Sequence, residues 1–149
     1  MKINNFVIVS ALWCILAALP ALAAESLRFD NALPRSSIER IKSYSFNVLN
    51  HDIENLEIAR IDLNGDGLDE FIARQKNCTQ TGVCAYHVLA ETPDGILPLG
   101  AFEGLNVLLG SEFSHGVRNL MVFKNTVNDY DFSLYTWHPE TSAYRKAAR

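Results

Sequence analysis

The spacing of hydrophobic residues changes twice along this chain of 149 residues. An almost unbroken apolar run occupies residues 6–19, after a single lysine at position 2. Between residues 37 and 49, apolar residues recur three or four positions apart, which is typical of a helix with one buried face. From residue 56 onward they recur mainly at every second position, as in strands of a half-buried sheet. The pattern therefore predicts a leader segment, one helix and a β-rich remainder.

The helix is predicted to span residues 37–49 and to end near residue 50. Its start, Ser36-Ser37-Ile38-Glu39, matches a capping box, in which the side chains of Ser36 and Glu39 each accept a backbone N–H. The apolar side chains at helical spacing are Ile38, Ile41, Tyr44 and Val48.

Eight short strands are expected after the helix, separated by turn sequences such as Pro93-Asp94-Gly95. They span residues 56–61, 70–74, 84–91, 96–99, 105–109, 117–124, 130–137 and 143–144. Trp137 and Tyr144 flank the last turn and are expected to form an aromatic cross-strand pair. The predicted fold class is α+β: one N-terminal helix followed by a mainly antiparallel, curved β-sheet of about eight short strands.

A weak internal similarity relates residues 67–73 to residues 116–122, which lie 49 positions further along. This offset is close to the length of a four-stranded propeller blade. The sheet is therefore compatible with two degenerate propeller-blade-like units, although two blades cannot close a propeller and chance similarity is the alternative. In the second copy, Ser111, Phe113 and His115 replace the polar positions 62, 64 and 66 of the first.

Residues 1–24 have the organisation of a secretory signal peptide. The apolar run is followed by Pro20 and by Ala21-Leu22-Ala23, a small-residue pattern that favours cleavage after Ala23 or Ala24. An uncleaved membrane anchor is the alternative, but the run is barely long enough to cross a bilayer. Residues 25–149 are then expected to form a single exported domain, periplasmic or secreted, with no membrane contact after cleavage.

The formal charge of the chain is −4, and removal of the leader with Lys2 and no acidic residue makes it −5. Nucleic-acid binding requires clusters of lysine and arginine opposite the phosphates. An acidic domain of this kind is therefore not expected to bind nucleic acid.

Two cysteines, Cys78 and Cys84, remain after the leader with Cys14 is removed. In an oxidising compartment an even pair at this spacing predicts a disulfide, closing a loop whose composition suits a hairpin tip. A zinc site is not expected, because no second cysteine pair or nearby histidine completes a tetrahedral set.

The segment Ile61-Asp62-Leu63-Asn64-Gly65-Asp66-Gly67-Leu68-Asp69-Glu70 places side-chain oxygens at alternate positions of a tight turn. Such oxygens can converge on one hard cation, and Ca²⁺ prefers six to eight oxygen ligands. The ligands expected from this spacing are the side chains of Asp62, Asn64 and Asp66 and the backbone carbonyl of Leu68. An EF-hand is not indicated, because its twelfth position would be Ala73 instead of glutamate. A metal-free turn is the alternative, although a turn alone does not need four acids.

This pattern resembles the calcium loops of FG-GAP and VCBS-type repeats, over residues 58–72 only. Those loops run Asp-x-Asp/Asn-x-Asp-Gly-x-x-Asp between two strands, and the resemblance implies the same ligand positions here. The chain departs from the pattern at Glu70, which stands in place of aspartate. Glu70 would bind directly, bind through water, or leave the role to Asp69. With strands on both sides, the ion is expected to be structural.

No catalytic residue is predicted. The four histidines do not share a metal-binding spacing, and neither Ser114-His115 with Asp131 nor Glu103 with Asp131 is accompanied by a catalytic motif. Tyr130 and Trp137 are candidates for partner binding, because aromatic side chains near a loop bury large areas at low entropic cost. The alternative is that they fill the β core.

The predicted function is that of an exported, non-enzymatic binding domain with a protein partner. Its size, leader, single disulfide and lack of catalytic motifs resemble the organisation of small periplasmic inhibitors and immunity proteins. That resemblance implies a role in blocking a hydrolase or toxin. A calcium-dependent adhesion or glycan-recognition module is one alternative, and a hydrolase with an unrecognised site is another.

Overall fold

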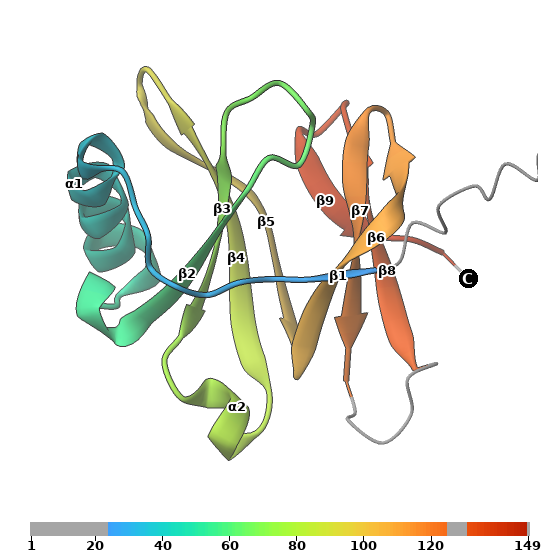
Figure 1. Cartoon of the computed structure of the whole chain (residues 1–149), viewed down its shortest axis with the longest axis horizontal. Helices are drawn as coiled ribbons and strands as arrows, with labels where there is room; N and C mark the ends of the chain where they lie inside the picture. Colours follow the sequence, from blue (N-terminus) through green and yellow to red (C-terminus); the bar gives the residue numbers. More distant parts are fainter. Residues whose placement is uncertain (1–23, 125–130, 149) are drawn as a thin grey trace, which may run out of the picture.

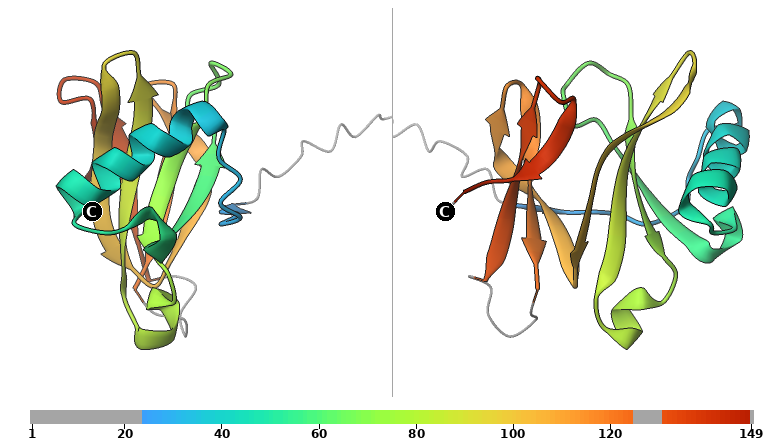
Figure 2. Two further views of the ribbon diagram at one scale, coloured as in Figure 1. Left: turned by 90° about the vertical axis from the view of Figure 1, so that its left-hand side faces the viewer. Right: turned by 180° about the vertical axis from the view of Figure 1, so that it is seen from behind.

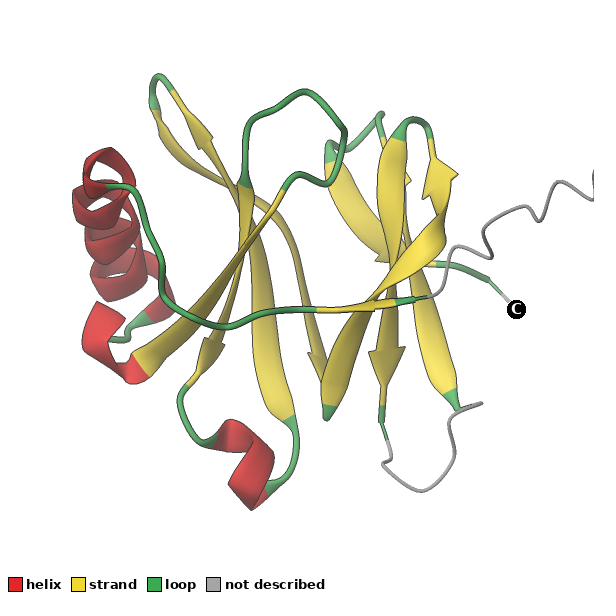
Figure 3. Ribbon diagram, viewed as in Figure 1, coloured by secondary structure: helices red, strands yellow, loops and turns green. Residues whose placement is uncertain are grey.

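The computed structural model describes residues 24–124 and 131–148. Three layers follow one another in Figure 1: helix α1, a four-stranded sheet and a five-stranded sheet. The two further views in Figure 2 show α1 lying obliquely across the outer face of the four-stranded sheet. Strands and connecting loops make up most of the described chain, as Figure 3 shows.

The elements follow in chain order: β1 (Glu25–Ser26), α1 (Arg35–Tyr44), η1 (Ser45–Leu49), η2 (Ile53–Asn55), β2 (Leu56–Ile61), β3 (Glu70–Gln75), α2 (Cys78–Thr81), β4 (Cys84–Thr92), β5 (Gly95–Gly104), β6 (Asn106–Ser114), β7 (Val117–Phe123), β8 (Phe132–His138) and β9 (Ala143–Lys146).

Both sheets are antiparallel, which confirms the predicted α+β class. The first sheet has the order β2-β3-β4-β5 and the second has the order β1-β6-β7-β8-β9. Apart from β1, each sheet is thus a meander of four consecutive strands. The strands form two packed sheets. The predicted strand 130–137 corresponds to β8, and its predicted first residue, 130, lies outside the described residues.

The two sheets meet at Leu105, the single residue between β5 and β6. The Leu105 N–H donates to the Phe123 carbonyl over 2.7 Å, so the chain enters β6 already paired with β7. Gly104 precedes this junction, where an added Cβ would lie 2.5 Å from Val122 Cγ1 and 3.0 Å from the Phe123 oxygen. Only glycine fits this crossing without a shift of the neighbouring strand.

The main core lies between the inner faces of the two sheets. Tyr86 and Phe102 of the first sheet stack with ring centroids 5.9 Å apart, and Phe102 lies 4.9 Å from Tyr135 of the second. Alternate residues of β7, Leu120 and Val122, are almost completely buried in the same cluster. Side chains at every second position thus supply this core, as the period of two predicts.

A second, smaller core lies between α1 and the outer face of the first sheet. Ile41 of the helix is buried there with the aliphatic and aromatic residues Leu56, Ile58, Phe71 and Leu89. Both faces of the first sheet are therefore covered, one by α1 and the other by the second sheet.

The helix departs from prediction at both ends. It begins at Arg35 after Pro34, and no side chain caps its first turn, so the predicted capping box is wrong. Proline suits this position because it sets a fixed φ and lacks an N–H that would need a partner. The Ser37 hydroxyl bonds to Glu91 of β4 over 2.5 Å, which draws the helix start onto the sheet.

At its C-terminal end, α1 continues into the π-helix η1. A π-helix closes hydrogen bonds over five residues, so it shifts the following side chains relative to an α-helical face. Ile41 and Ser45 are buried, and Leu49 is partly buried, whereas Val48 is 60% exposed. The prediction that Val48 belongs to the buried face is therefore wrong.

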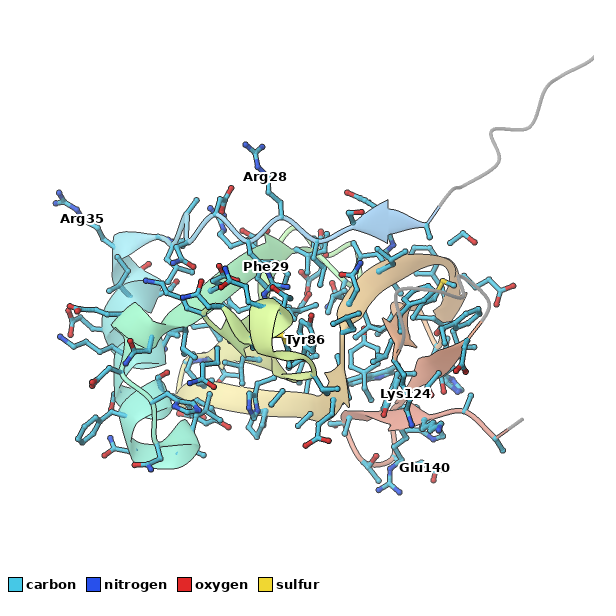
Figure 4. The ribbon with its side chains drawn as sticks, turned by 90° about the horizontal axis from the view of Figure 1, so that it is seen from below. Arg28, Phe29, Arg35, Tyr86, Lys124 and Glu140 are labelled. Atoms are coloured by element: carbon cyan, nitrogen blue, oxygen red, sulfur yellow. A yellow bond between two sulfur atoms is a disulfide. The ribbon has the colours of Figure 1, made fainter. Side chains whose placement is uncertain are left out.

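An N-terminal strap, residues 24–33, crosses from the second sheet to α1 (Figure 1). Glu25 pairs with Leu109 in β6, and Phe29 forms an isolated bridge with Ala59 in β2. Arg28 projects away from the molecule whereas Phe29 turns towards Tyr86, with ring centroids 6.3 Å apart (Figure 4). The strap therefore ties the two sheets together along one side.

The last hairpin forms as predicted. Trp137 of β8 pairs with Tyr144 of β9, and their rings meet edge to face with centroids 5.6 Å apart. The Tyr144 hydroxyl donates to the Arg118 carbonyl over 2.7 Å. This hairpin is thus fixed to β7 as well as to its own partner strand.

Candidate metal centre

The acidic loop, residues 62–69, joins β2 to β3 at the end of the first sheet opposite α2 (Figures 1 and 3). Hairpin pairing of Ile61 with Glu70 brings its two ends together. The buried Leu63 side chain anchors the loop in the main core, and the Leu63 carbonyl accepts the Arg118 N–H over 2.8 Å. The loop is therefore fixed to both sheets.

Asp62 organises the turn. Its carboxylate accepts backbone N–H groups from Asn64 (3.3 Å), Gly65 (2.6 Å) and Gly67 (2.9 Å). The bond from the Gly67 N–H contributes most to lowering the pKa of Asp62 below its ordinary value, and the other backbone bonds add to it. All of them favour the charged form of the carboxylate. Gly65 and Gly67 both have positive φ angles, of 76° and 83°, which glycine adopts without steric cost.

Asn64 and Asp66 form the second turn of the loop. The Asn64 Oδ1 accepts the Asp66 N–H over 2.9 Å, and the Asn64 amide donates to Asp66 Oδ2 over 3.0 Å. Asp66 Oδ1 accepts the Leu68 N–H over 2.7 Å. The alternate polar positions thus turn inward along the loop, and the Leu68 side chain is 69% exposed.

Glu70, and not Asp69, faces the inside of the loop. Asp69 forms an ion pair and hydrogen bonds with Arg60 on the neighbouring strand. Glu70 is only 7% exposed, and its Oε2 accepts the Leu63 N–H over 2.8 Å. Burial raises the pKa of Glu70, and the like charges of Asp66 and Asp62 raise it further.

Asp69 is the one acidic residue at this loop whose charge a described cationic side chain balances. In the described part of the chain, Asp62, Asp66 and Glu70 form no ion pair with lysine, arginine or histidine. The set of three carboxylates, one amide and a nearby backbone carbonyl has the chemistry that Ca²⁺ prefers. These residues therefore fit a calcium ion by ligand type.

The carboxylates do not, however, lie as a ready-made cluster. Within residues 24–124 and 131–148, no three side chains from histidine, cysteine, aspartate and glutamate are gathered closely enough to hold a metal ion. Asp62, Asp66 and Glu70 each accept backbone N–H groups instead. The loop geometry is thus also that of a well-bonded turn, and the calcium site stays a prediction.

The disulfide is the second feature that fixes β3. Cys78 and Cys84 are joined, with Cα atoms 5.2 Å apart, as the sequence predicts. The segment between them contains the short helix α2 and joins the antiparallel strands β3 and β4, so it lies at the tip of a hairpin, as the sequence predicts. Because the acidic loop precedes β3 and the disulfide follows it, the strand is held at both ends.

The aromatic candidates for partner binding have different positions. The Trp137 ring is partly buried against the main core and lies edge-on to Tyr144, so the core alternative accounts for its place. Tyr130 lies outside the described residues. A partner-binding role for either residue stays a prediction.

Sequence reasoning missed the Arg60–Asp69 pair and the anchoring of Leu63 by Arg118. The hairpin register that pairs Ile61 with Glu70 would have placed Arg60 near Asp69. The contact between Leu63 and Arg118 joins separate sheets, and no local sequence signal indicates it.

Comparison with known proteins adds no family assignment: no family model, curated protein or solved structure matches the chain.

Proposed function

We propose that this chain is an exported, non-enzymatic binding domain that uses a structural Ca²⁺ ion and blocks a hydrolase or toxin. The observation that carries the calcium part is that Asp62 and Asp66 of the acidic loop, and Glu70 directly after it, form no ion pair with a cationic side chain in the described residues. The oxygens of these residues, of Asn64 and of the Leu68 carbonyl would hold the ion.

The role of the ion follows from the place of the loop. Burial raises the pKa of Glu70, and repulsion from Asp66 and Asp62 raises it further, so a divalent cation would offset the cost of keeping these carboxylates charged. The loop is bonded to β7 through Leu63 and Arg118, so an ion that stabilises the loop also stabilises the contact between the sheets. Calcium is therefore proposed to act on stability.

Calorimetric titration of Ca²⁺ into EDTA-treated protein, with thermal unfolding in parallel, tests this proposal. An ion that binds only the folded state adds about 2.7 kcal/mol to the free energy of unfolding at 100 times its Kd. For a domain of this size, that corresponds to a rise in Tm of about 10 °C. Absence of heat and of any Tm change at millimolar calcium would refute the calcium site.

Two matched variants separate calcium binding from ordinary turn stability. Asp62→Asn should lower the stability of the metal-free protein, because charge-assisted bonds from the loop are weakened. It should also abolish the increment that calcium adds. Asp69→Asn removes the Arg60 ion pair from the same loop but should keep the full increment. Equal calcium increments in both variants would contradict the ligand assignment.

The export part is supported by the leader pattern of residues 1–24 and by the disulfide. In the described residues, no helix is long and apolar enough to cross a membrane. Mass spectrometry of the protein recovered from the cell envelope tests the leader: cleavage after Ala23 or Ala24 is expected. An intact N-terminus on the exported protein would refute cleavage.

The binding part is tested with the immobilised mature protein and the exported proteins of the same cell. The proposal requires a stoichiometric protein partner that is a hydrolase or toxin, whose activity falls in proportion to added protein. A captured partner whose activity is unchanged, or no partner at all, would contradict it. Repeating the capture after EDTA treatment distinguishes a purely structural ion from one that contacts the ligand, as in an adhesion or glycan-recognition module.

A further inference from the structure

A second surface lies on the outside of the molecule, where α1 passes into η1. Phe46 and Val48 of η1 are 65% and 60% exposed there. Phe46 borders a depression of about 290 Å³ whose other walls are Lys42, Asp52, Ile53 and Glu54. An exposed phenyl ring thus stands beside a hollow with an isoleucine in its wall.

The charged groups around this depression are of opposite sign. Lys42 comes from α1, whereas Asp52 and Glu54 come from the start of η2. In the described part of the chain, none of these three side chains forms an ion pair. Each charge therefore remains available to a group outside the chain.

We propose that this surface, Lys42, Phe46, Asp52, Ile53 and Glu54, is a two-fold interface between two copies of the chain. In a two-fold interface, residue i of one copy meets residue j of the second, and j meets i. Lys42 of each copy would then face Asp52 and Glu54 of the other, while the two Phe46 rings bury each other over the depressions. Both sets of unpaired charges are satisfied at once.

Charge complementarity selects a second copy as the occupant. A uniformly acidic partner would match only Lys42, and a uniformly basic one would match only the two acids. A second copy carries both signs on this one surface. Phe46 is the one large exposed apolar side chain among these five residues, so the contact buries less than the roughly 800 Å² per partner of stable complexes, and the dimer is weak and forms at high protein concentration.

The dimer leaves the acidic loop accessible. That loop lies beside the opposite end of α1, where Pro34 and Ser37 share a depression of about 300 Å³ with Leu68 and Asp69. The proposed self-association is therefore independent of the calcium proposal and of the partner proposed above.

Sedimentation velocity of the calcium-loaded mature protein, up to about 1 mM, tests the proposal. Dimer formation is expected, and it should weaken as the salt concentration rises from about 0.05 M to about 0.5 M. Lys42→Glu alone, or Asp52→Lys with Glu54→Lys, should each weaken dimerisation about tenfold or more. Phe46→Ala should weaken it similarly. All four side chains point to solvent or border the hollow, and circular dichroism of each variant checks that the fold is kept.

Recovery of dimerisation after full charge reversal is the decisive experiment. A chain carrying Lys42→Glu, Asp52→Lys and Glu54→Lys together should dimerise again, because its reversed charges still complement one another across the two-fold axis. An equimolar mixture of the Lys42→Glu chain with the chain carrying Asp52→Lys and Glu54→Lys should likewise form a mixed dimer. A wild-type chain that stays monomeric at about 1 mM, or a dimer that none of these changes weakens, would overturn the proposal. Failure of the triple variant to recover would overturn the two-fold pairing.

Discussion

The Cys78–Cys84 disulfide offers a quantitative test of the fold. The bond spans a sequence separation of 6, so it closes a loop of seven residues between β3 and β4. In the chain-entropy model, a loop of this length lowers the entropy of the unfolded chain enough to stabilise the fold by about 2.4 kcal/mol at 25 °C. Reduction removes no side-chain atom and only adds one hydrogen to each sulfur. It therefore measures the contribution of the cross-link to stability more directly than a substitution does.

Equilibrium urea unfolding with and without reductant measures this contribution. With an m-value of about 1.5 kcal/mol per M, reduction should lower the urea midpoint by about 1.6 M and leave the native fold intact. Thiol titration of the unfolded protein confirms that the bond is open. The variant Cys78→Ala with Cys84→Ala serves as the control, and its midpoint should not respond to reductant.

Two results would refute this reasoning. An unchanged midpoint after complete reduction would show that the bond does not constrain the unfolded chain. Complete loss of the folded state without urea would show that the cysteines contribute far more than loop closure. Because Cys84 is fully buried in the main core, the double alanine variant should be less stable than the reduced wild-type protein.

Three further predictions concern single side chains. Gly104→Ala should cost about 1–3 kcal/mol of unfolding free energy, because its Cβ would lie 2.5 Å from Val122 Cγ1. Urea unfolding should show a smaller cost when the same substitution is made in a Val122→Ala background. An equal cost in both backgrounds would contradict the clash. Tyr144→Phe should lower stability by about 1 kcal/mol or somewhat more in thermal unfolding, since it removes the 2.7 Å bond to the Arg118 carbonyl; an unchanged Tm would exclude that contribution. Burial, with a smaller effect of the neighbouring His51, lowers the pKa of His87 below its ordinary 6.5. Between the lowered pKa and 6.5 the unfolded state therefore binds more protons than the folded state, so the free energy of unfolding falls as the pH falls through that range. Urea midpoints between about pH 7.5 and about pH 5 should therefore drop less in His87→Gln than in the wild-type protein, and parallel profiles would refute this assignment.

The strands were predictable because two independent local signals agree. Short runs rich in apolar residues define β2, β3, β4 and β7 to within a residue or so, and the turn at Pro93 and Asp94 separates β4 from β5. The partition into two packed sheets was not predictable. It depends on the single-residue junction at Leu105 and on contacts between distant residues, which leave no periodic signal in the sequence.

The helix shows where local rules fail. Apolar spacing located it correctly, but Ser36 does not cap it, because Pro34 supplies the start and Ser37 bonds to Glu91 on the sheet. The chain changes to a π-helix after Tyr44, and spacing at the α-helical period predicts neither this change nor the exposure of Val48. A tertiary contact was therefore needed to explain the start of the helix, and no local rule explains its end.

The candidate site was predictable in position and only partly in geometry. The alternation of Asp62, Asn64 and Asp66 correctly indicated a tight loop between two strands. Which of Asp69 and Glu70 faces the loop depended on Arg60, a residue outside the motif. A sequence motif gives the positions of the metal ligands, but it does not include nearby side chains, such as Arg60, that can bind the same carboxylates.

The N-terminal strap has a consequence for how the polypeptide matures. Synthesis releases Glu25 early, yet its pairing partner Leu109 belongs to β6 and leaves the ribosome only after the entire first sheet. Until then, the backbone of Phe29 can bridge to Ala59 in β2, but the first residues of the strap lack their pairing partner in β6. The first residues of the domain to be made are consequently among the last to be fixed, and a protease present during that interval would find them accessible.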